Sequence, residues 1–348
     1  MAMFWSGCEN SDDPQPTEQD YVNLLTNQVT EVIIPSMENY AVSLNELSQA
    51  ADQFSMEINP GNLAELQQAF RSAYLIYQNA AIHNYFATAN QALIETSNLF
   101  PIDTNLLEEL ISNERYDFAT TAQMRANGFP AMDYMLYGTA DALSYFQQDS
   151  KRLVFLQALI TFMKDKSEVL ANQWKGNLKD NFIDNGGTAL GSSLSVQLNE
   201  TMVYWETHIR ENKVGIPIGR LGPNDSPIPA DPTKIEAYYL SENVGDESFT
   251  LDLLRAAVKG MEDVYLGRNG SGVDGQGYDD LLIARQQPSV DEDIKNQFQI
   301  IYDVIEDRVS ISGDDELYNA LQQIVTIYKS DLFPILNVQD ADGKNDGD

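Results

Sequence analysis

The sequence predicts an all-α protein of two consecutive helical bundles, each of about four helices, with the functional cleft at their interface. Apolar residues recur three and four positions apart in long segments, which is the spacing of one buried helix face. No alternating run of β-branched residues of strand length competes with this pattern. Clusters of proline and glycine separate the periodic segments. With 348 residues, the chain has the length of two ordinary domains.

Five segments carry the helical spacing clearly enough to name their buried faces. The first lies in residues 66–81, and the second begins near Lys151. The acidic run 314–316 is typical of a helix start, where negative charge complements the helix dipole. The predicted buried positions are, in chain order, Leu66, Phe70, Ala73, Tyr77, Ala81, Leu156, Ile160, Met163, Leu251, Leu254, Val258, Met261, Tyr265, Ile294, Phe298, Ile301, Ile305, Val309, Leu317, Leu321, Ile324 and Tyr328.

Breaks in this pattern divide the chain. The run Asn59-Pro60-Gly61-Asn62 separates two long helices, and the stretch 215–232 contains too many prolines to be one helix. We place the boundary between the bundles near residues 140–150. The predicted segments are a signal remnant and lipoprotein tether at 1–18, an N-terminal bundle at 19–149, a C-terminal bundle at 150–337 and an acidic tail at 338–348.

Composition limits the kinds of partner. Asp and Glu total 53 against 21 for Lys and Arg, which makes the net charge −32. Such a chain repels phosphate backbones, so we expect no nucleic-acid partner, whereas metal ions and other cations are compatible. One cysteine excludes an internal disulfide. Two histidines leave little room for a histidine-rich metal site, and we expect His83 to be a packed helix residue and His208 to form a surface ion pair.

The only cysteine follows small residues near the start of the chain. Ser6-Gly7-Cys8, after a short apolar stretch, resembles the end of a bacterial lipoprotein signal, in which the cysteine becomes lipidated. We therefore expect an exported protein, lipid-anchored through Cys8 in the cell envelope and facing the periplasm or the cell surface. The acidic segment 9–18 would then be a flexible tether. The apolar stretch is shorter than a full signal, which leaves an ordinary terminus as the alternative.

Residues 128–138, Gly-Phe-Pro-Ala-Met-Asp-Tyr-Met-Leu-Tyr-Gly, form the most distinctive motif. Pro130 suits the first position of a helix, Asp133 would fall in its first turn, and Gly138 permits a turn at its end. In the first turn, the helix dipole favours the ionised form of the Asp133 carboxyl. From these residues alone, the simplest interpretation is a short capped helix between longer ones.

The same motif resembles the signature of the imelysin family, G-x-H-x-x-E followed by an apolar run and a glycine. Gly128 matches the glycine, Pro130 occupies the histidine position, and Asp133 occupies the glutamate position. Further blocks resemble the family in the same order along the chain, at 69–78, 98–103, 191–193, 213–219, 235–239 and 340–348. These are bacterial exported proteins, named for an insulin-cleaving peptidase and linked in several members to iron uptake. The resemblance implies two helical bundles with a pocket where they meet.

Departures from the signature decide which function the resemblance implies here. A histidine and a glutamate three residues apart can ligate one metal, but the proline side chain offers neither donor nor acceptor. Asp133 alone supplies too few ligands for a catalytic zinc ion. We therefore expect a non-catalytic binding protein, associated with the uptake of iron or another divalent cation and with other envelope uptake proteins. The alternatives are a metallopeptidase of the imelysin type and a protein-docking module of the cell envelope.

The predicted site takes a metal ion or small ligand at the interface between the bundles, where pockets often form. Asp133 is a candidate partner for a cation or for a basic side chain such as Arg71. Asp133 and Glu236 are the candidate metal ligands, although Glu236 could equally be an exposed acid on a short helix. The predicted ligand-binding residues, all in family-like segments, are Gly128, Pro130, Asp133, Tyr137, Arg71, Tyr77, Lys213 and Glu236.

Overall fold

Helices account for nearly all regular structure in this protein. The computed structural model describes residues 16–85, 92–221, 226–313 and 315–341. Within these residues, the only strands are β1 (Arg220–Leu221) and β2 (Ser226–Pro227), which form one short antiparallel pair. The all-α prediction is confirmed. Cys8, most of the predicted tether and residues 342–348 lie outside the described residues, and no helix in the described part is long and apolar enough to cross a membrane.

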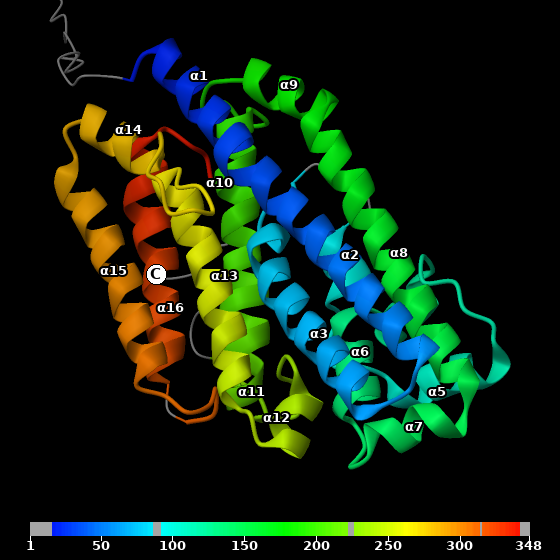
Figure 1. The fold of residues 1–348 in the computed structure, drawn as a ribbon. Coiled ribbons are helices and arrows are strands. Elements are labelled where there is room, and N and C mark those ends of the chain that lie inside the picture. The colour runs from blue at the N-terminus through cyan, green and yellow to red at the C-terminus, as the bar shows by residue number, and fades with distance from the viewer. Residues whose placement is uncertain (1–15, 86–91, 222–225, 314, 342–348) are drawn as a thin grey trace, which may run out of the picture.

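The N-terminal helices are grouped around α2 (Figure 1). The chain enters through α1 (Glu18–Asn27), the π-helix η1 (Gln28–Ile33) and α2 (Ile34–Met56), which follow one another directly. Both α3 (Pro60–Ala81) and α8 (Ser150–Lys175) pack along α2. Between α3 and α8 lie α4 (Leu93–Ser97), α5 (Thr104–Asn113), the 3₁₀-helix η2 (Thr121–Ala126), α6 (Gly128–Tyr137) and α7 (Ala142–Gln148).

The packing of α8 differs from the predicted division of the chain. The sequence places α8 at the start of the second bundle, but this helix packs against α2, and α9 (Asn177–Asp184) packs against α8 and α1. The chain therefore still packs against the N-terminal helices after residue 150. Apolar spacing identifies which face of α8 is buried, but it does not identify the helix that covers this face.

The remaining helices form a second group, which meets the first along α3. In this group α13 (Ser248–Leu266) packs against α3, α15 (Pro288–Glu306) packs against α16 (Glu316–Ile327), and α16 packs against the π-helix η3 (Trp205–Gly215). Gly260 lies at the crossing of α13 and α3, where a Cβ atom would be 3.4 Å from Cα of Asn79. The other elements are α10 (Ser193–Tyr204), α11 (Ile216–Ile218), α12 (Tyr238–Val244), α14 (Tyr278–Ala284), the π-helix η4 (Tyr328–Leu332) and α17 (Phe333–Ile335).

Capping side chains explain where several helices begin. Thr17 and Asp20 form a capping box at the start of α1, in which the Asp20 N–H donates to Thr17 Oγ1 and the Thr17 N–H donates to Asp20 Oδ2. Asn59 Oδ1 accepts from the Asn62 N–H at 2.9 Å, and Pro60 occupies the first helical position of α3. The predicted break at residues 59–62 is therefore confirmed.

The predicted buried faces are confirmed with one exception. The named positions of residues 66–81, 156–163, 251–265 and 317–328 are all buried in one continuous core. In α15, Ile294, Phe298, Ile301 and Ile305 are buried, but Val309 is 81% exposed. The helix ends at Glu306, so Val309 no longer follows the helical spacing that would have turned it inward.

Gly128 fixes the position of α6 against α4. Its φ angle is +74°, in the left-handed region that favours glycine. A Cβ atom at this position would lie 2.2 Å from the carbonyl oxygen of Ser97, far inside van der Waals contact. Since the motif begins at this residue, the close approach of the two backbones determines where Pro130 and Asp133 are held.

We predict that Gly128→Ala destabilises the protein by more than about 2 kcal/mol, because it adds both backbone strain and a steric clash with Ser97. Urea unfolding followed by circular dichroism measures the effect. Gly191→Ala is the matched control, since Gly191 also has a positive φ, +85°, but nothing within 4 Å of its Cβ position. It should cost only about 1 kcal/mol. Equal losses in the two variants would contradict the clash.

Candidate functional site

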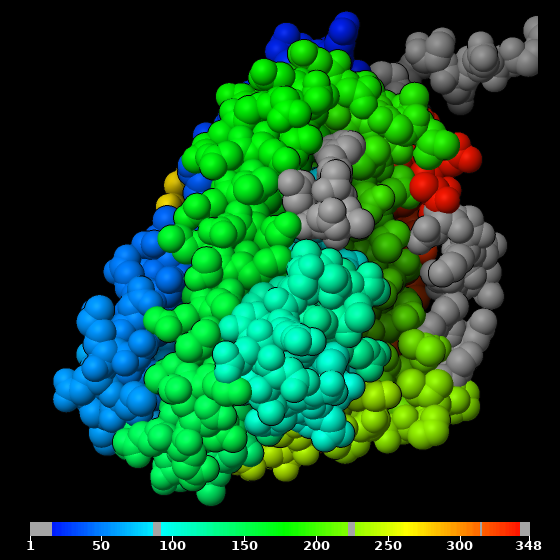
Figure 2. Space-filling model, turned by 90° about the vertical axis from the view of Figure 1, so that its right-hand side faces the viewer, coloured from blue at the N-terminus to red at the C-terminus, as the bar shows by residue number. Residues whose placement is uncertain are grey.

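A pocket of about 140 Å³ lies beside the distinctive motif. We call it the Pro130 pocket. It is formed where α6 meets the turn after α4 and the segment before α12, and Figure 2 shows residues near 100–130 (cyan) adjoining residues near 227–240 (yellow-green) on one face of the molecule. Its lining is mostly apolar and aromatic, with one carboxylate. The lining residues are Phe100, Pro101, Ile102, Pro130, Asp133, Thr233, Ile235, Ala237, Tyr238 and Tyr239.

Asp133 is the only acidic residue that lines the Pro130 pocket, and it is 2% exposed. Its Oδ2 accepts from the N–H of Tyr239 at 2.8 Å, and its Oδ1 accepts from the N–H of Leu240 at 3.1 Å. These two N–H groups belong to the first turn of α12, whose own N-cap residue, Ala237, supplies no side-chain hydrogen bond. Asp133 therefore caps a helix more than 100 residues further along the chain.

This placement corrects the expectation that Asp133 lies in the first turn of its own helix. The helix α6 begins at Gly128, and its N-cap residue is Asn127, whose Oδ1 accepts from the Gly128 N–H. Pro130 is therefore the third residue of the helix, and Asp133 lies in its second turn. Because the helix starts earlier than predicted, its own dipole does not act on Asp133 as expected. The favourable N–H groups come from α12 instead.

Burial changes the ionisation of Asp133. Removal from water raises the pKa of its carboxyl to about 7, although the two N–H donors of α12 and the Arg71 charge act in the opposite direction. The expectation that this carboxyl stays fully ionised is therefore wrong. Near neutral pH, the Asp133 carboxyl is therefore present in both the charged and the neutral form.

Arg71 pairs with a residue other than Asp133. Its Nη1 donates to Asp246 Oδ2 at 2.6 Å, and its guanidinium lies 5.1 Å from the ring centre of Phe249 and 5.9 Å from that of Tyr137. Arg71 and Tyr137 thus form a neighbouring polar and aromatic cluster. Neither residue is among those that line the Pro130 pocket.

Tyr77 belongs to the core. Its ring is 5.3 Å from that of Phe129 and 5.5 Å from that of Tyr40, measured between ring centres. Only 1% of the residue is exposed. The aromatic spacing of α3 that includes Tyr77 therefore marks a packed helix face.

Glu236 and Lys213 form a buried ion pair with two amide side chains. The carboxylate is bonded to Lys213 Nζ, and its Oε1 also accepts from Asn98 Nδ2 at 2.5 Å and from Gln78 Nε2 at 3.2 Å. Lys213 Nζ donates in turn to Gln78 Oε1 at 2.9 Å. The side chains of Glu236 and Lys213 are 1% and 4% exposed. We call these four residues the Glu236 cluster.

The Glu236 cluster decides between the two interpretations of this glutamate. The interpretation of Glu236 as an exposed acid on a short helix is wrong, because Glu236 is buried and precedes α12. Its carboxylate oxygens contact an ammonium and two amides, and it does not line the Pro130 pocket, although Ile235 and Ala237 on either side do. The structure thus brings Asp133 and Glu236 to the same segment, but bonds them to different partners.

Sequence reasoning missed part of the site. Gln78, Asn98, Tyr238 and Tyr239 lie inside family-like blocks but were not singled out. An available signal was Gln78 itself, a polar residue between the apolar positions Tyr77 and Ala81 that were predicted to be buried. A buried amide within such a stretch indicates a partner that needs it.

The histidines lie outside the Pro130 pocket. His83 is 1% exposed and bonded through Nδ1 to the Tyr85 hydroxyl at 2.9 Å, which confirms a packed residue. His208 contacts Asn212 and the ring of Tyr204 rather than an acid, so the predicted surface ion pair is wrong. Burial lowers the pKa of His208 to about 4. Among the described residues, no three His, Cys, Asp or Glu side chains are grouped so as to hold a metal ion.

Comparisons with known proteins assign the chain to a family. The sequence profile described as Imelysin matches residues 33–326, which includes every residue of the Pro130 pocket and of the Glu236 cluster. The chain belongs to the imelysin family. No curated protein matches it.

Two solved structures share the imelysin fold of this chain. An imelysin-like protein from Psychrobacter arcticum has a TM-score of 0.73 at 16% identity, and the match covers 94% of this chain and 98% of that one. An iron-regulated protein A precursor from Parabacteroides distasonis has a TM-score of 0.73 at 15% identity, with 92% and 96% covered. At such identities, the likeness concerns the fold.

We predict that the Asp133 carboxyl makes stability fall as pH rises from about 4 to 7. The folded state raises the pKa of Asp133 to about 7, so it holds a proton that the unfolded chain, with the ordinary value near 3.8, has already released. The free energy of unfolding of the wild type, minus that of Asp133→Asn, should decrease by about 1 kcal/mol or more per pH unit across this window.

Urea unfolding at several pH values measures this difference. Asp165→Asn is the matched control, because Asp165 is an exposed acid on α8, and the corresponding difference should stay flat. A wild-type advantage over Asp133→Asn that is constant, or that grows with pH, would show that the carboxyl is ionised in the folded protein.

Proposed function

We propose that this chain is a non-catalytic imelysin-type binding protein of the bacterial cell envelope, which takes a cation at the Pro130 pocket and serves the uptake of iron or another divalent cation. One observation carries the proposal. Asp133, at the glutamate position of the family signature, lines the pocket with a carboxylate that is bonded to backbone N–H groups and to no side-chain cation among the described residues. Each carboxylate oxygen keeps a further lone pair for a ligand.

The chemistry of Pro130 favours binding over catalysis. Where the family signature has a histidine, this residue lines the pocket with a ring that neither accepts nor donates a proton. An acid–base pair or a two-residue metal clamp is therefore missing from the motif, although a pocket lies beside it. The family resemblance and the name of the Parabacteroides distasonis protein, iron-regulated, support a role in iron uptake.

Export and lipid anchoring complete the proposal. Ser6-Gly7-Cys8 and the acidic residues after it support a lipidated cysteine, and the Parabacteroides distasonis protein is named a precursor. We propose that the lipid on Cys8 is the contact with the membrane and that other envelope uptake proteins are the partners.

The cation site predicts that the purified chain binds one Fe²⁺ or Mn²⁺ ion in anaerobic titration calorimetry. Asp133→Asn should weaken this binding at least about tenfold, because a neutral amide replaces the only carboxylate of the pocket. The control, Asp165→Asn, should bind as the wild type does. If neither cation binds, a protein-docking role of the pocket becomes the better interpretation.

The same preparation tests the peptidase alternative. Incubation with an unfolded protein substrate, with and without a chelator, should show no cleavage. Chelator-sensitive cleavage that persists through further purification would reverse the order of the two functions.

The anchor predicts that cells expressing the full-length gene incorporate labelled palmitate into the protein. Cys8→Ala should abolish the label and release the protein from the membrane fraction, since the thiol is the acceptor of the lipid. Equal labelling of the two proteins would contradict the anchor without affecting the cation site.

A further inference from the structure

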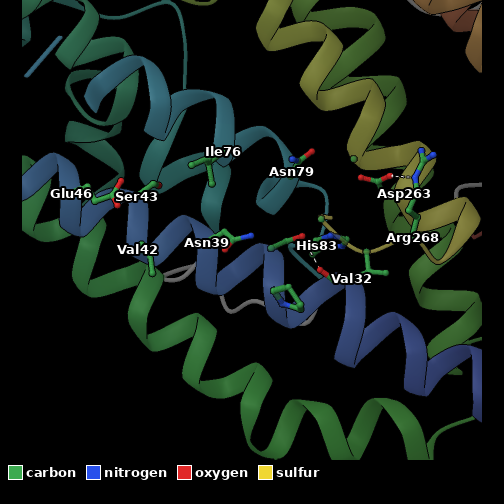
Figure 3. Close-up of a pocket in the computed structure, with 14 residues that line it drawn as sticks. Val32, Asn39, Val42, Ser43, Glu46, Ile76, Asn79, His83, Asp263 and Arg268 are labelled. Atoms are coloured by element: carbon green, nitrogen blue, oxygen red, sulfur yellow. Dashed lines mark hydrogen bonds and ion pairs between the residues drawn. The ribbon is translucent and has the colours of Figure 1, made fainter. Parts of the chain in front are cut away.

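Two cavities of this protein differ in how their charged side chains are partnered. One, of about 250 Å³, opens between α2, α3 and α13 (Figure 3). Arg268 in its wall donates through Nε to Asp263 at 2.8 Å, so this arginine already has a carboxylate partner. In the Pro130 pocket, the Asp133 carboxylate receives two backbone N–H groups but no side-chain cation among the described residues. A positive charge on a ligand would therefore meet an unpaired carboxylate in the Pro130 pocket.

Three partly exposed aromatic residues line the Pro130 pocket. They are Phe100, Tyr238 and Tyr239, and they offer the accessible surface that the buried Asp133 lacks. The rings of Tyr238 and Tyr239 meet edge to face, with 5.1 Å between their centres. Tyr239 makes the same kind of contact with Tyr134 at 5.2 Å, so its ring is held from two sides. A ligand in the pocket thus contacts aromatic rings beside one carboxylate.

The charge of the Pro130 pocket is negative. Asp133 is the only charged residue in its lining. Two basic residues of neighbouring segments have other carboxylate partners, because Arg71 pairs with Asp246 at 2.6 Å and Lys234 pairs with Asp231 at 3.5 Å. A cation that leaves bulk water for this pocket is therefore attracted in two ways, by the carboxylate and by the negative faces of the rings.

The hydrogen bonds of Asp133 indicate which kind of organic cation fits. A guanidinium binds a carboxylate best as a fork that uses both oxygens. Here Oδ2 and Oδ1 each already accept a backbone N–H, at 2.8 Å and 3.1 Å, which disfavours the fork. An ammonium group is compact and needs only one remaining lone pair. The volume of about 140 Å³ corresponds to roughly five water molecules, which limits the organic part to a short alkyl chain.

We propose that the Pro130 pocket binds a primary alkylammonium group, from a small amine or from a lysine side chain of a polypeptide. The alkyl chain and the charge lie against the aromatic rings, and the ammonium group donates to Asp133. This inference rests on the proposed function in that the pocket takes a cation, and it adds an organic cation that competes with the metal ion for Asp133. A divalent ion takes its further ligands from oxygen atoms, whereas the ammonium group uses the rings. Removal of a ring therefore separates the two kinds of binding.

Saturation-transfer NMR on the purified full chain tests the proposal with n-butylammonium as the probe. At about pH 8, the Asp133 carboxyl, whose pKa burial raises to about 7, is mostly ionised, and the probe is still charged. We expect a dissociation constant below about 10 mM. The uncharged isostere n-butanol and the forked cation n-propylguanidinium should each bind at least about fivefold more weakly. Equal or tighter binding of either, or no binding of n-butylammonium, would overturn the assignment.

A second probe distinguishes the two sources of the ammonium group. Nα-acetyl-L-lysine methylamide carries the same short chain on a peptide backbone. Binding at least as tight as that of n-butylammonium supports a lysine of a partner polypeptide, since the backbone then fits at the mouth of the pocket. Weaker binding supports a free amine.

Variants of Tyr238 place the binding in the Pro130 pocket. Tyr238→Leu should weaken n-butylammonium at least about fivefold more than it weakens Mn²⁺, because it removes a ring and no carboxylate. Tyr238→Phe keeps the ring and should restore the binding of n-butylammonium. Tyr21→Leu, at a half-buried tyrosine of α1 outside the pocket, is the matched control and should bind as the wild type does.

Phe100→Leu removes a ring from a different segment of the wall and should weaken n-butylammonium in the same way. Unchanged binding in both Tyr238→Leu and Phe100→Leu would refute the site, whatever the Mn²⁺ titration shows. A wild-type chain that binds n-butylammonium but no metal ion would contradict the metal proposal and support this one.

Discussion

A carboxylate and an ammonium that are both almost completely removed from water can persist only if each meets the other and their remaining bonds are satisfied. In this protein, Glu236 and Lys213 meet this condition with the help of Gln78 and Asn98. The four residues come from α3, the turn after α4, η3 and the segment before α12. Lys213 and Glu236 both belong to the second group of helices, whereas Gln78 and Asn98 belong to the first. Any slip between the two groups would therefore leave the ion pair buried without its two amide partners, so the cluster specifies how they fit together.

The Glu236 cluster also explains why the Pro130 pocket has its shape. Glu236 is held in the core, and its two neighbours, Ile235 and Ala237, are thereby placed in the wall of the pocket. Three and four residues after Glu236, the N–H groups of Tyr239 and Leu240 donate to Asp133. In the segment 235–240, residues that make structural hydrogen bonds are thus interspersed with residues that line the pocket. The wall of the Pro130 pocket is thus held in place by an ion pair that does not itself line the pocket.

The parts of this picture that depend on local spacing were predictable. The helices, most of their buried faces and the Pro-Gly breaks follow from the order of residues, because apolar periodicity and capping act within a few positions. The motif at Gly128 and its neighbourhood to the 235–239 segment followed from the family resemblance.

Contacts between distant segments could not be predicted from the sequence. Nothing near Asp133 indicates that it caps α12, and nothing near Glu236 indicates that its charge is met by Lys213. The packing of α8 with α2 is of the same kind. Apolar spacing tells which side of a helix is covered and leaves the covering partner unspecified, and the same limit applies to a buried charge.

The bond from Asp133 to α12 also bears on the order of assembly. It joins residues that are 106 and 107 positions apart, so its formation requires a long loop to close. When the ribosome has synthesised the signature motif at residues 128–138, the pocket residues 233–239 have not yet been made. The nascent chain can pack α2, α3 and α8 early, with the Asp133 carboxyl still in water. The Pro130 pocket therefore cannot form before Leu240 has been synthesised, and a shorter chain carries the motif without the pocket.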